Sequence, residues 1–250
     1  MNKRMIICTA AAFVSLVLVV LLASTLSAAY DPATYAQAAR AAYTGLTDDE
    51  VTRAVGLTQD AQARLAEEIV QYFRGKRAEL DMEADIVDPR TGETNAQPAF
   101  HERERAHMAD VRGLLDLAGR LMGALALVAL VAATAARVAG RQAGRATAAR
   151  AFFRGSVTGA LALALPVLAL SIWGAVDFTS LFYAFHDLAF TNDLWLLNPQ
   201  TDLLIRMMPE GLFVRLAASV AIKTGAVMAA LLLLAGIGAL RARKGKEAKV

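Results

Sequence analysis

Four long apolar stretches alternate with polar segments along this chain. They run approximately over residues 5–28, 114–136, 152–176 and 212–240. Each approaches the ~20 apolar residues that a helix needs to cross a hydrocarbon core roughly 30 Å thick. The pattern therefore predicts an all-α membrane protein with four transmembrane helices.

The first polar segment, residues 30–110, has the signals of a small, mainly helical domain. Thr47 and Glu50 have the spacing of a capping box, and Thr58 precedes an amphipathic run. The apolar positions of that run are Leu65, Ile69, Tyr72 and Phe73. Residues 88–92 (DPRTG) are typical of a turn. Apolar content is thin here, so we expect the domain to rest on the outer ends of the membrane helices.

The polar segment at residues 177–210 is unusually aromatic. Its aromatic residues, interspersed with acids, are Phe178, Phe182, Tyr183, Phe185, Phe190 and Trp195. Tryptophan often anchors a protein at headgroup depth, but this density of rings also suits the lining of a cavity. The mixture predicts a re-entrant or interfacial loop, which must be covered by protein or line a cavity.

Charged residues accompany two of the membrane helices. Residues 102–120 are polar and contain no helix breaker before Gly113, so we expect the second helix to begin outside the bilayer. Within it, Arg112, Asp116 and Arg120 follow i, i+4 spacing, which suits either a structural clasp or substrate contact. Lys223 lies inside the last apolar stretch on the face of Arg215, where we expect it to snorkel, to contact another helix or to meet an anionic lipid.

The composition agrees with a membrane protein, and the charge distribution indicates which segments face the cytoplasm. Hydrophobic residues make up 56% of the chain and the mean hydropathy is +0.43, too apolar for a soluble domain. The N-terminus, the segment from Arg137 to Arg154 and the C-terminal tail carry two, five and five basic residues against one acid. The two long connections are acidic instead. Positive segments favour the cytoplasm, so both termini are predicted inside.

These features together predict the organisation of the whole chain. The expected segments are a transmembrane helix at 1–29, an extracytoplasmic domain at 30–111, a transmembrane helix at 112–136, a basic cytoplasmic loop at 137–151, a transmembrane helix at 152–176, an extracytoplasmic interfacial loop at 177–210, a transmembrane helix at 211–240 and a basic cytoplasmic tail at 241–250. The first helix competes with a cleavable signal peptide, since residues 26–28 offer small side chains. Its apolar region is longer than is usual for a signal peptide, which favours an uncleaved anchor.

The candidate chemistry is limited to histidine. Of the three histidines, His107 and His186 are predicted at the same depth near the outer lipid esters, each with an acid nearby in Asp110 or Asp187. A structural hydrogen-bonding role is the alternative for each, and His101 lies in a charged run expected to be solvated. The single cysteine, Cys8, excludes disulfide and thiol-metal chemistry, and no metal, phosphate-loop or serine-hydrolase motif is present. We therefore expect no cofactor.

Two segments carry a resemblance to a known family. Residues 104–111 (ERAHMADV) are similar to a pattern E-x-x-H-M-x-D-V, and residues 185–199 (FHDLAFTNDLWLLNP), followed by TD, LI and PEG, resemble a dense second signature. Both belong to the lipoprotein intramolecular transacylases, small four-span proteins of Gram-positive bacteria. Ala189 stands where that family usually has phenylalanine, which puts substrate preference in doubt more than chemistry.

The resemblance implies a reaction and a site. The sn-2 acyl chain of a diacylglyceryl lipoprotein in the outer leaflet moves to the α-amino group of its N-terminal cysteine, giving lyso-form lipoprotein in the bacterial plasma membrane. We assign His107 as base and His186 as its partner or oxyanion stabiliser, roles that the sequence leaves open. The expected substrate-binding or orienting residues are Asp110, Asp187, Asn192, Asp193, Trp195, Asp202, Arg120 and Lys223.

Two other functions remain open from the sequence. A membrane lipid esterase or phospholipase would use the same histidines with water as nucleophile. A non-catalytic membrane partner would use the acidic outer domain to bind another protein. The only other expected partner is membrane lipid, and nucleic acid is not expected.

Overall fold

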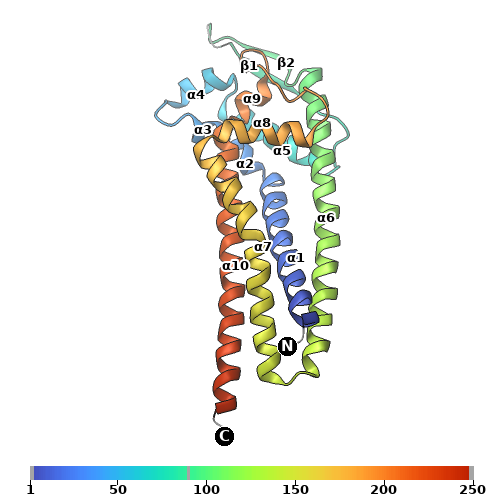
Figure 1. The fold of residues 1–250 in the computed structure, drawn as a ribbon. Helices are drawn as coiled ribbons and strands as arrows, with labels where there is room; N and C mark the ends of the chain where they lie inside the picture. Colours follow the sequence, from blue (N-terminus) through green and yellow to red (C-terminus); the bar gives the residue numbers. More distant parts are fainter. Residues whose placement is uncertain (1–2, 89–90, 248–250) are drawn as a thin grey trace. The chain divides into compact units, whose positions relative to one another are not determined.

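A computed structural model describes residues 3–88 and 91–247, and almost every element in them is helical (Figure 1). The elements in chain order are α1 (Lys3–Ala29), α2 (Pro32–Ala36), α3 (Ala38–Ala42), α4 (Asp48–Val55), α5 (Gln59–Phe73), β1 (Glu83–Val87), β2 (Thr94–Pro98), α6 (Glu102–Arg141), α7 (Arg145–Val176), α8 (Phe178–Ala189), α9 (Leu203–Met207) and α10 (Glu210–Glu247). The chain forms two compact units. The bundle unit comprises Met1–Ser24, Ala118–Val176 and Ser219–Val250, and the histidine unit comprises Thr25–Leu117 and Asp177–Ala218.

Four helices are long and apolar enough to cross a membrane, as the sequence predicts. They are α1, α6, α7 and α10, whose most apolar windows have mean hydropathies of 2.9, 2.0, 2.0 and 2.1. The 40 residues of α6 correspond to about 60 Å, twice the hydrocarbon thickness. Its first turns precede the apolar stretch that begins at Leu114 and belong to the histidine unit. These turns are the extension expected from the sequence, and their position outside the bilayer stays a prediction.

Within the bundle unit, α1 and α7 pack closely through small residues. Gly155 and Gly159 of α7 are spaced as GxxxG, a motif that lets two membrane helices approach each other. A Cβ atom at Gly155 would lie 2.5 Å from Thr9 Cβ and 2.7 Å from the Ile6 carbonyl oxygen, both on α1. Thr9 is itself buried, and its hydroxyl donates a 2.8 Å hydrogen bond to the Met5 carbonyl. A residue larger than glycine therefore does not fit at position 155 of α7.

This contact yields a prediction for the stability of the bundle. Gly155→Ala should destabilise the protein by about 1–3 kcal/mol, because the added methyl overpacks against the α1 backbone. Gly225→Ala on α10 is the matched control, since no atom lies within 4 Å of a Cβ there. The midpoint of thermal unfolding in detergent measures the effect. Equal midpoints for the two variants would contradict the close packing of α1 on α7.

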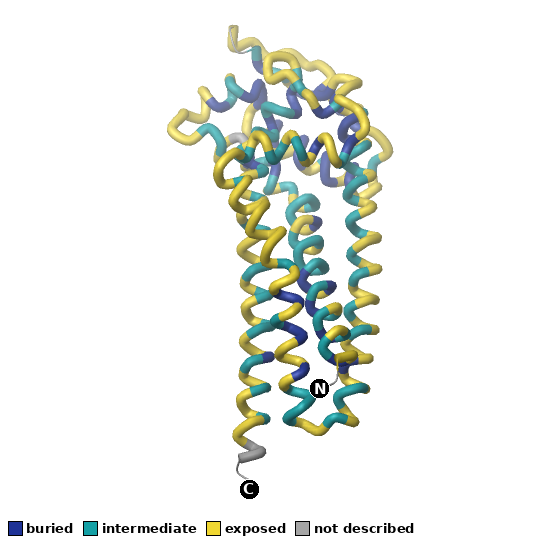
Figure 2. Tube along the Cα trace, viewed as in Figure 1, coloured by how far each residue is buried: buried dark blue, intermediate teal, exposed yellow. Residues whose placement is uncertain are grey.

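The histidine unit has a hydrophobic core of its own, visible as dark blue segments in Figure 2. The amphipathic helix α5 supplies the predicted residues Leu65, Ile69, Tyr72 and Phe73, all buried. Thr47 caps α4 in the predicted capping box, and Thr58 caps α5 by accepting from Ala61 N at 3.3 Å. Met108 of α6 and Leu212 of α10 join the same core. The domain therefore packs on the ends of these two long helices, as its low apolar content suggests.

A β-hairpin in this unit is not predicted by the sequence. β1 and β2 pair antiparallel, from Glu83 opposite Pro98 to Val87 opposite Thr94. Every residue of β2 is exposed, so the strand lacks the alternation of apolar and polar residues that reveals strands. The predicted turn at residues 88–92 joins the strands. Pro89 and Arg90 lie outside the described residues, but Gly92 N donates to the Asp88 carbonyl at 2.9 Å, which closes the turn.

The aromatic segment at residues 177–210 is largely helical. Asp177 caps α8 by accepting a hydrogen bond from Ser180 N at 2.9 Å, and α9 follows after an ordered loop. Thr179 Oγ1 donates to the Glu210 carboxylate at 2.9 Å, which ties the start of α8 to the start of α10. The segment therefore consists of α8, the connecting residues 190–202, which we call the return loop, and α9. Its re-entrant or interfacial position stays a prediction.

Candidate functional site

The two histidines predicted to share a depth lie next to each other in the histidine unit. The ring centroids of His107 and His186 are 6.1 Å apart, and the rings are tilted by 36°. His107 comes from the second turn of α6 and His186 from the third turn of α8. The side chains are 8% and 7% exposed, so both imidazoles are largely removed from water. The structure thus joins two segments that are 79 positions apart in the sequence.

Aromatic rings surround this pair. Phe190 contacts both imidazoles, at centroid distances of 5.2 Å to His107 and 5.5 Å to His186. The rings of Phe182 and Trp195 lie 4.0 and 4.8 Å from that of His186. Such walls lower the local dielectric and exclude water, and both effects strengthen electrostatic interactions with a reacting group.

The tautomer of His186 is fixed by a backbone hydrogen bond. Its Nδ1 lies 2.7 Å from the carbonyl oxygen of Phe182, one helical turn earlier. A carbonyl only accepts, so Nδ1 carries the proton and donates it. In the neutral ring Nε2 then keeps a free lone pair, which is the arrangement of a general base. Burial lowers the pKa of His186, while the Phe182 hydrogen bond and the charge of Asp187 act in the opposite direction.

His107 has a different environment. Its Nδ1 is buried and has no hydrogen-bond partner in the described part of the chain. Burial is the main cause that lowers the pKa of His107 to about 4, and His186 adds to the effect while Asp110 opposes it. His107 is therefore neutral at pH 7. A buried nitrogen without a partner costs about 1–3 kcal/mol, which marks it as available to a substrate.

One face of α6 holds the return loop in place. Arg103, His107 and Asp110 follow i, i+4, i+7 spacing and so share that face. Arg103 donates to the backbone carbonyl of Asp193, and Asp110 accepts a 2.9 Å hydrogen bond from the Asn192 amide. The loop that carries Phe190 and Trp195 is thereby attached to α6 on both sides of His107.

Glu104 lies in the same turn, about 100° around the helix axis from Arg103. It is fully buried, and its two carboxylate oxygens accept 2.7 Å hydrogen bonds from His101 N and Leu204 N. One bond closes the first turn of α6 and the other satisfies the start of α9, which is 100 positions away. Burial raises the pKa of the Glu104 carboxyl, against the lowering effect of the two backbone bonds. This carboxylate connects α6 to α9.

The remaining predicted site residues differ in their positions. Trp195 contacts the ring of His186 and Asn192 donates to Asp110, while their roles toward a substrate stay predictions. Asp187 is exposed and acts on His186 only through its charge, whereas Asp193 contributes its backbone carbonyl.

For three further predicted residues, Asp202, Arg120 and Lys223, the site role stays a prediction. Asp202 orders its own loop by accepting from Asn198 N at 2.7 Å. Arg120 and Lys223 belong to the bundle unit, so their predicted roles stay predictions.

One group of side chains has the composition of a metal site. Ligand atoms of His101, Glu104 and Asp202 lie within 4.8 Å of one another. Both oxygens of Glu104 are engaged by backbone N–H groups, and Asp202 accepts from Asn198 N and from the Thr201 hydroxyl. These carboxylates are used for folding, so we assign no metal to them.

Three contributors to the site are not among the site residues predicted from the sequence. Arg103 and Glu104 lie in a charged run that looks solvated, although Glu104 also begins the family pattern at residues 104–111. Phe182 is predicted only as one of the aromatic residues that suit the lining of a cavity. The i, i+4, i+7 spacing of Arg103 with His107 and Asp110 was the available signal. No sequence signal identifies the burial of Glu104, because its partner Leu204 lies in another segment.

Four long apolar helices define a polytopic membrane protein, and its buried histidine pair offers side chains of the kind that transfer protons. A family model described as lipoprotein intramolecular transacylase Lit matches residues 10–213. The chain belongs to this family, and it is therefore an acyltransferase that is integral to a membrane. A comparison with curated protein sequences finds no match.

Solved structures agree with this fold. The membrane-integral lipoprotein intramolecular transacylase Lit from Bacillus cereus is similar with a TM-score of 0.65 and 18% identity, covering 99% of each chain. A histidine-to-arginine variant of it gives 0.64 at 18% identity over 95% of this chain and 93% of that one. A histidine-to-alanine variant gives 0.56 at 19% identity over 95% and 94%. At these identities the likeness concerns the fold.

Proposed function

We propose that this enzyme moves the sn-2 acyl group of a diacylglyceryl lipoprotein to the α-amino group of the N-terminal cysteine of the same molecule. The product is a lyso-form lipoprotein. The observation that carries the proposal is the buried pair of neutral histidines, His107 and His186, inside a cage of aromatic rings. Family membership supplies the reaction class, and the pair supplies the proton transfers that such a reaction needs.

His186 is the general base in this proposal. An α-amine with a pKa near 8 is mostly protonated at neutral pH, so one proton passes to solvent to give the neutral amine that attacks the ester. The free Nε2 of His186 accepts a second proton from the amine nitrogen as the C–N bond forms. It then returns the proton to the glycerol oxygen as the ester C–O bond breaks. No atom is gained or lost, so the mass of the substrate is unchanged.

His107 stabilises the oxyanion of the tetrahedral intermediate. Its buried Nδ1, which lacks a partner in the described residues, is suited to donate a hydrogen bond to that oxygen. The sequence interpretation gives the opposite roles, with His107 as base. The hydrogen bond of His186 Nδ1 to the Phe182 carbonyl favours the assignment proposed here.

Exposed apolar residues support a position at the lipid surface. Next to the site, Phe185 and Leu188 of α8 are 49% and 89% exposed, and Leu196 of the return loop is 43% exposed. Such side chains suit contact with acyl chains rather than water. With the basic segments in the cytoplasm, the histidine unit faces the outer leaflet of the bacterial plasma membrane, where the lipoprotein substrate and membrane lipids lie. The transmembrane and extramembrane segments have the residue ranges predicted from the sequence.

The lowered pKa values give a prediction for the acid limb of the pH profile. The base works only when neutral, and a lowered pKa keeps it neutral below the ordinary histidine value of about 6.5. The acid limb of kcat/KM reports the free enzyme and the free substrate, so it should contain the step of the α-amine near pH 8 and a separate step of the histidine base with its midpoint below 6.5. Initial rates measured between pH 4.5 and 9 test this. A histidine step at or above 6.5 would argue against a buried neutral base.

The product distinguishes transfer from hydrolysis. The protein is expressed in a host whose lipoproteins are not N-acylated, and the N-terminal lipopeptide of one lipoprotein is analysed by tandem mass spectrometry. Transfer gives an acylated amine at unchanged total mass. An esterase would give a lyso-lipid and free fatty acid, and an unshifted diacylglyceryl peptide despite confirmed expression would contradict acyl transfer altogether.

A further inference from the structure

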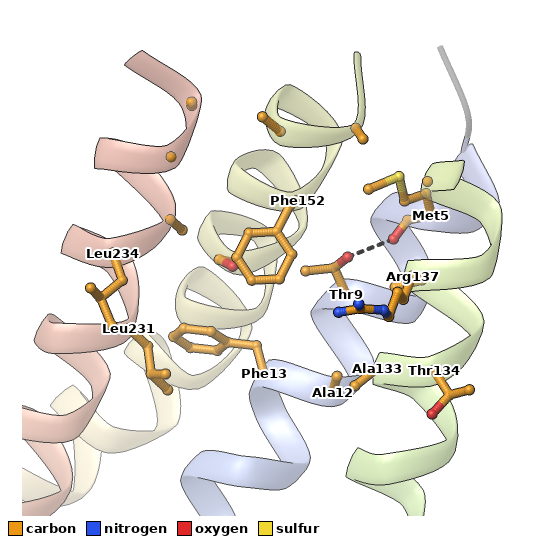
Figure 3. Close-up of a pocket in the computed structure, with 18 of the residues that line it drawn as sticks. Met5, Thr9, Ala12, Phe13, Ala133, Thr134, Arg137, Phe152, Leu231 and Leu234 are labelled. Carbon is orange, nitrogen blue, oxygen red and sulfur yellow. Dashed lines mark hydrogen bonds between the residues drawn. The ribbon is translucent and has the colours of Figure 1, made fainter. Parts of the chain in front are cut away.

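The bundle unit contains a cavity that the acyl-transfer chemistry does not use. It has a volume of about 1130 Å³ and lies between α1, α6, α7 and α10, at the end where α6 and α7 are joined (Figure 3). Figure 3 shows Phe13, Phe152, Leu231 and Leu234 around it, from three of the four helices. Sites for small organic ligands have volumes of roughly 300–1,000 Å³, so this space is large enough for part of a lipid.

The lining is chemically divided. Most of the wall is apolar or made of small residues, including Ala129, Ala133 and Gly140. At one end the lining includes Arg137, Arg141 and Arg145. None of the residues that line the cavity in the described part of the chain is acidic. The ion pairs in the described part of the chain involve Arg40 and Arg77, and none involves these three arginines.

The local backbone brings the three arginines together. Arg137 and Arg141 are one helical turn apart on α6, and the Arg137 side chain extends toward α1 in Figure 3. α6 ends at Arg141, and α7 begins at Arg145 after three residues. Gly144 closes that turn with φ +73°, a left-handed conformation that favours glycine. The tight turn places three like charges at one end of an apolar space, where they repel each other unless an anion is present.

We propose that the cavity binds an anionic phospholipid of the leaflet next to the α6–α7 turn. The phosphate contacts the guanidinium groups of Arg137, Arg141 and Arg145, and acyl chain occupies the apolar part. Arginine forms charge-assisted, often bidentate hydrogen bonds with phosphate, and basic pockets between membrane helices suit anionic headgroups. A free phosphate would leave the apolar wall uncovered, and a zwitterionic lipid would offer the arginines no net charge. The inference does not depend on the proposed acyl transfer.

The test is a lipid titration of the full chain in detergent, read by native mass spectrometry. The probe is 1-palmitoyl-2-oleoyl phosphatidylglycerol, with the phosphatidylcholine of the same chains for comparison. Arg137→Gln with Arg141→Gln should raise the Kd for phosphatidylglycerol by about tenfold or more. Ala133→Phe, which fills the apolar part without changing charge, should raise it to a similar extent.

A matched double variant controls for charge alone. Arg150→Gln with Arg154→Gln removes two arginines from α7 that do not line the cavity, so the Kd should change less than about twofold. Equal weakening by both double variants would overturn the proposal, since surface charge would then explain binding. Unchanged binding in Ala133→Phe, equal affinity for phosphatidylcholine or displacement by inorganic phosphate alone would also overturn it.

Discussion

Replacing His186 by alanine should lower kcat for acyl transfer by about a thousandfold. A positioned general base contributes roughly 10²–10⁴ to a rate, and His186 is proposed to act in both halves of the reaction. His107→Ala should lower kcat by about a hundredfold or more, the size expected for the loss of one oxyanion donor. The rate is measured on a synthetic diacylglyceryl lipopeptide in detergent, with the acylated amine as the product that is counted.

His101→Ala is the matched control for these two variants. It is the third histidine of the chain, and its side chain is exposed outside the aromatic cage. Its rate should be within about twofold of that of the parent protein, because surface substitutions are usually close to neutral. A His186→Ala protein that folds normally and keeps a tenth or more of the parent rate would contradict the role of His186 as base.

Glu104→Ala should destabilise the protein by about 3–5 kcal/mol. The change leaves the buried Leu204 N–H and the partly buried His101 N–H without their acceptor, at up to about 1–3 kcal/mol each, and it creates a cavity. Glu104→Gln should have a smaller effect, because the amide keeps one acceptor oxygen but turns its NH₂ group toward the second backbone donor. Thermal or denaturant unfolding in detergent measures both variants.

Glu102→Ala is the control for the loss of an acid from the same helix terminus. Glu102 is exposed in the first turn of α6, where an acid contributes only about 0.3–1 kcal/mol through the helix dipole. The expected order of stability is Glu102→Ala, then Glu104→Gln, then Glu104→Ala as the least stable. If Glu104→Ala were as stable as Glu102→Ala, Glu104 would not connect α6 to α9.

The parts of this fold that local patterns control were predictable from the sequence. Apolar stretches of sufficient length define α1, α6, α7 and α10, and Thr47 and Thr58 cap helices because capping is a short-range interaction. Residues 104–111 and 185–199 carry dense enough signatures to identify the family, which the family match over residues 10–213 confirms. Each of these signals is contained within a few turns of chain.

The contacts that complete the site escaped the sequence because their partners are backbone groups. Glu104 begins the pattern at residues 104–111, but the pattern does not show that its carboxylate accepts from Leu204 N, 100 positions away. The roles of the histidines depend on a single backbone carbonyl, that of Phe182, and no residue type reveals which ring nitrogen it contacts. The exposed polar strand β2 lacks the periodicity on which strand prediction depends. In each case the deciding partner is a backbone group whose position only the fold determines.

A crossover experiment tests the central claim most directly. One lipopeptide carries a deuterated sn-2 acyl chain on a ¹⁵N-labelled peptide, a second carries neither label, and the purified enzyme acts on an equimolar mixture. The account predicts that every N-acylated product keeps its own pairing of acyl chain and peptide, with total mass unchanged, and that His186→Ala forms almost none. Products that combine the deuterated chain with the unlabelled peptide, or free deuterated fatty acid as the main product, would contradict intramolecular transfer at this histidine pair.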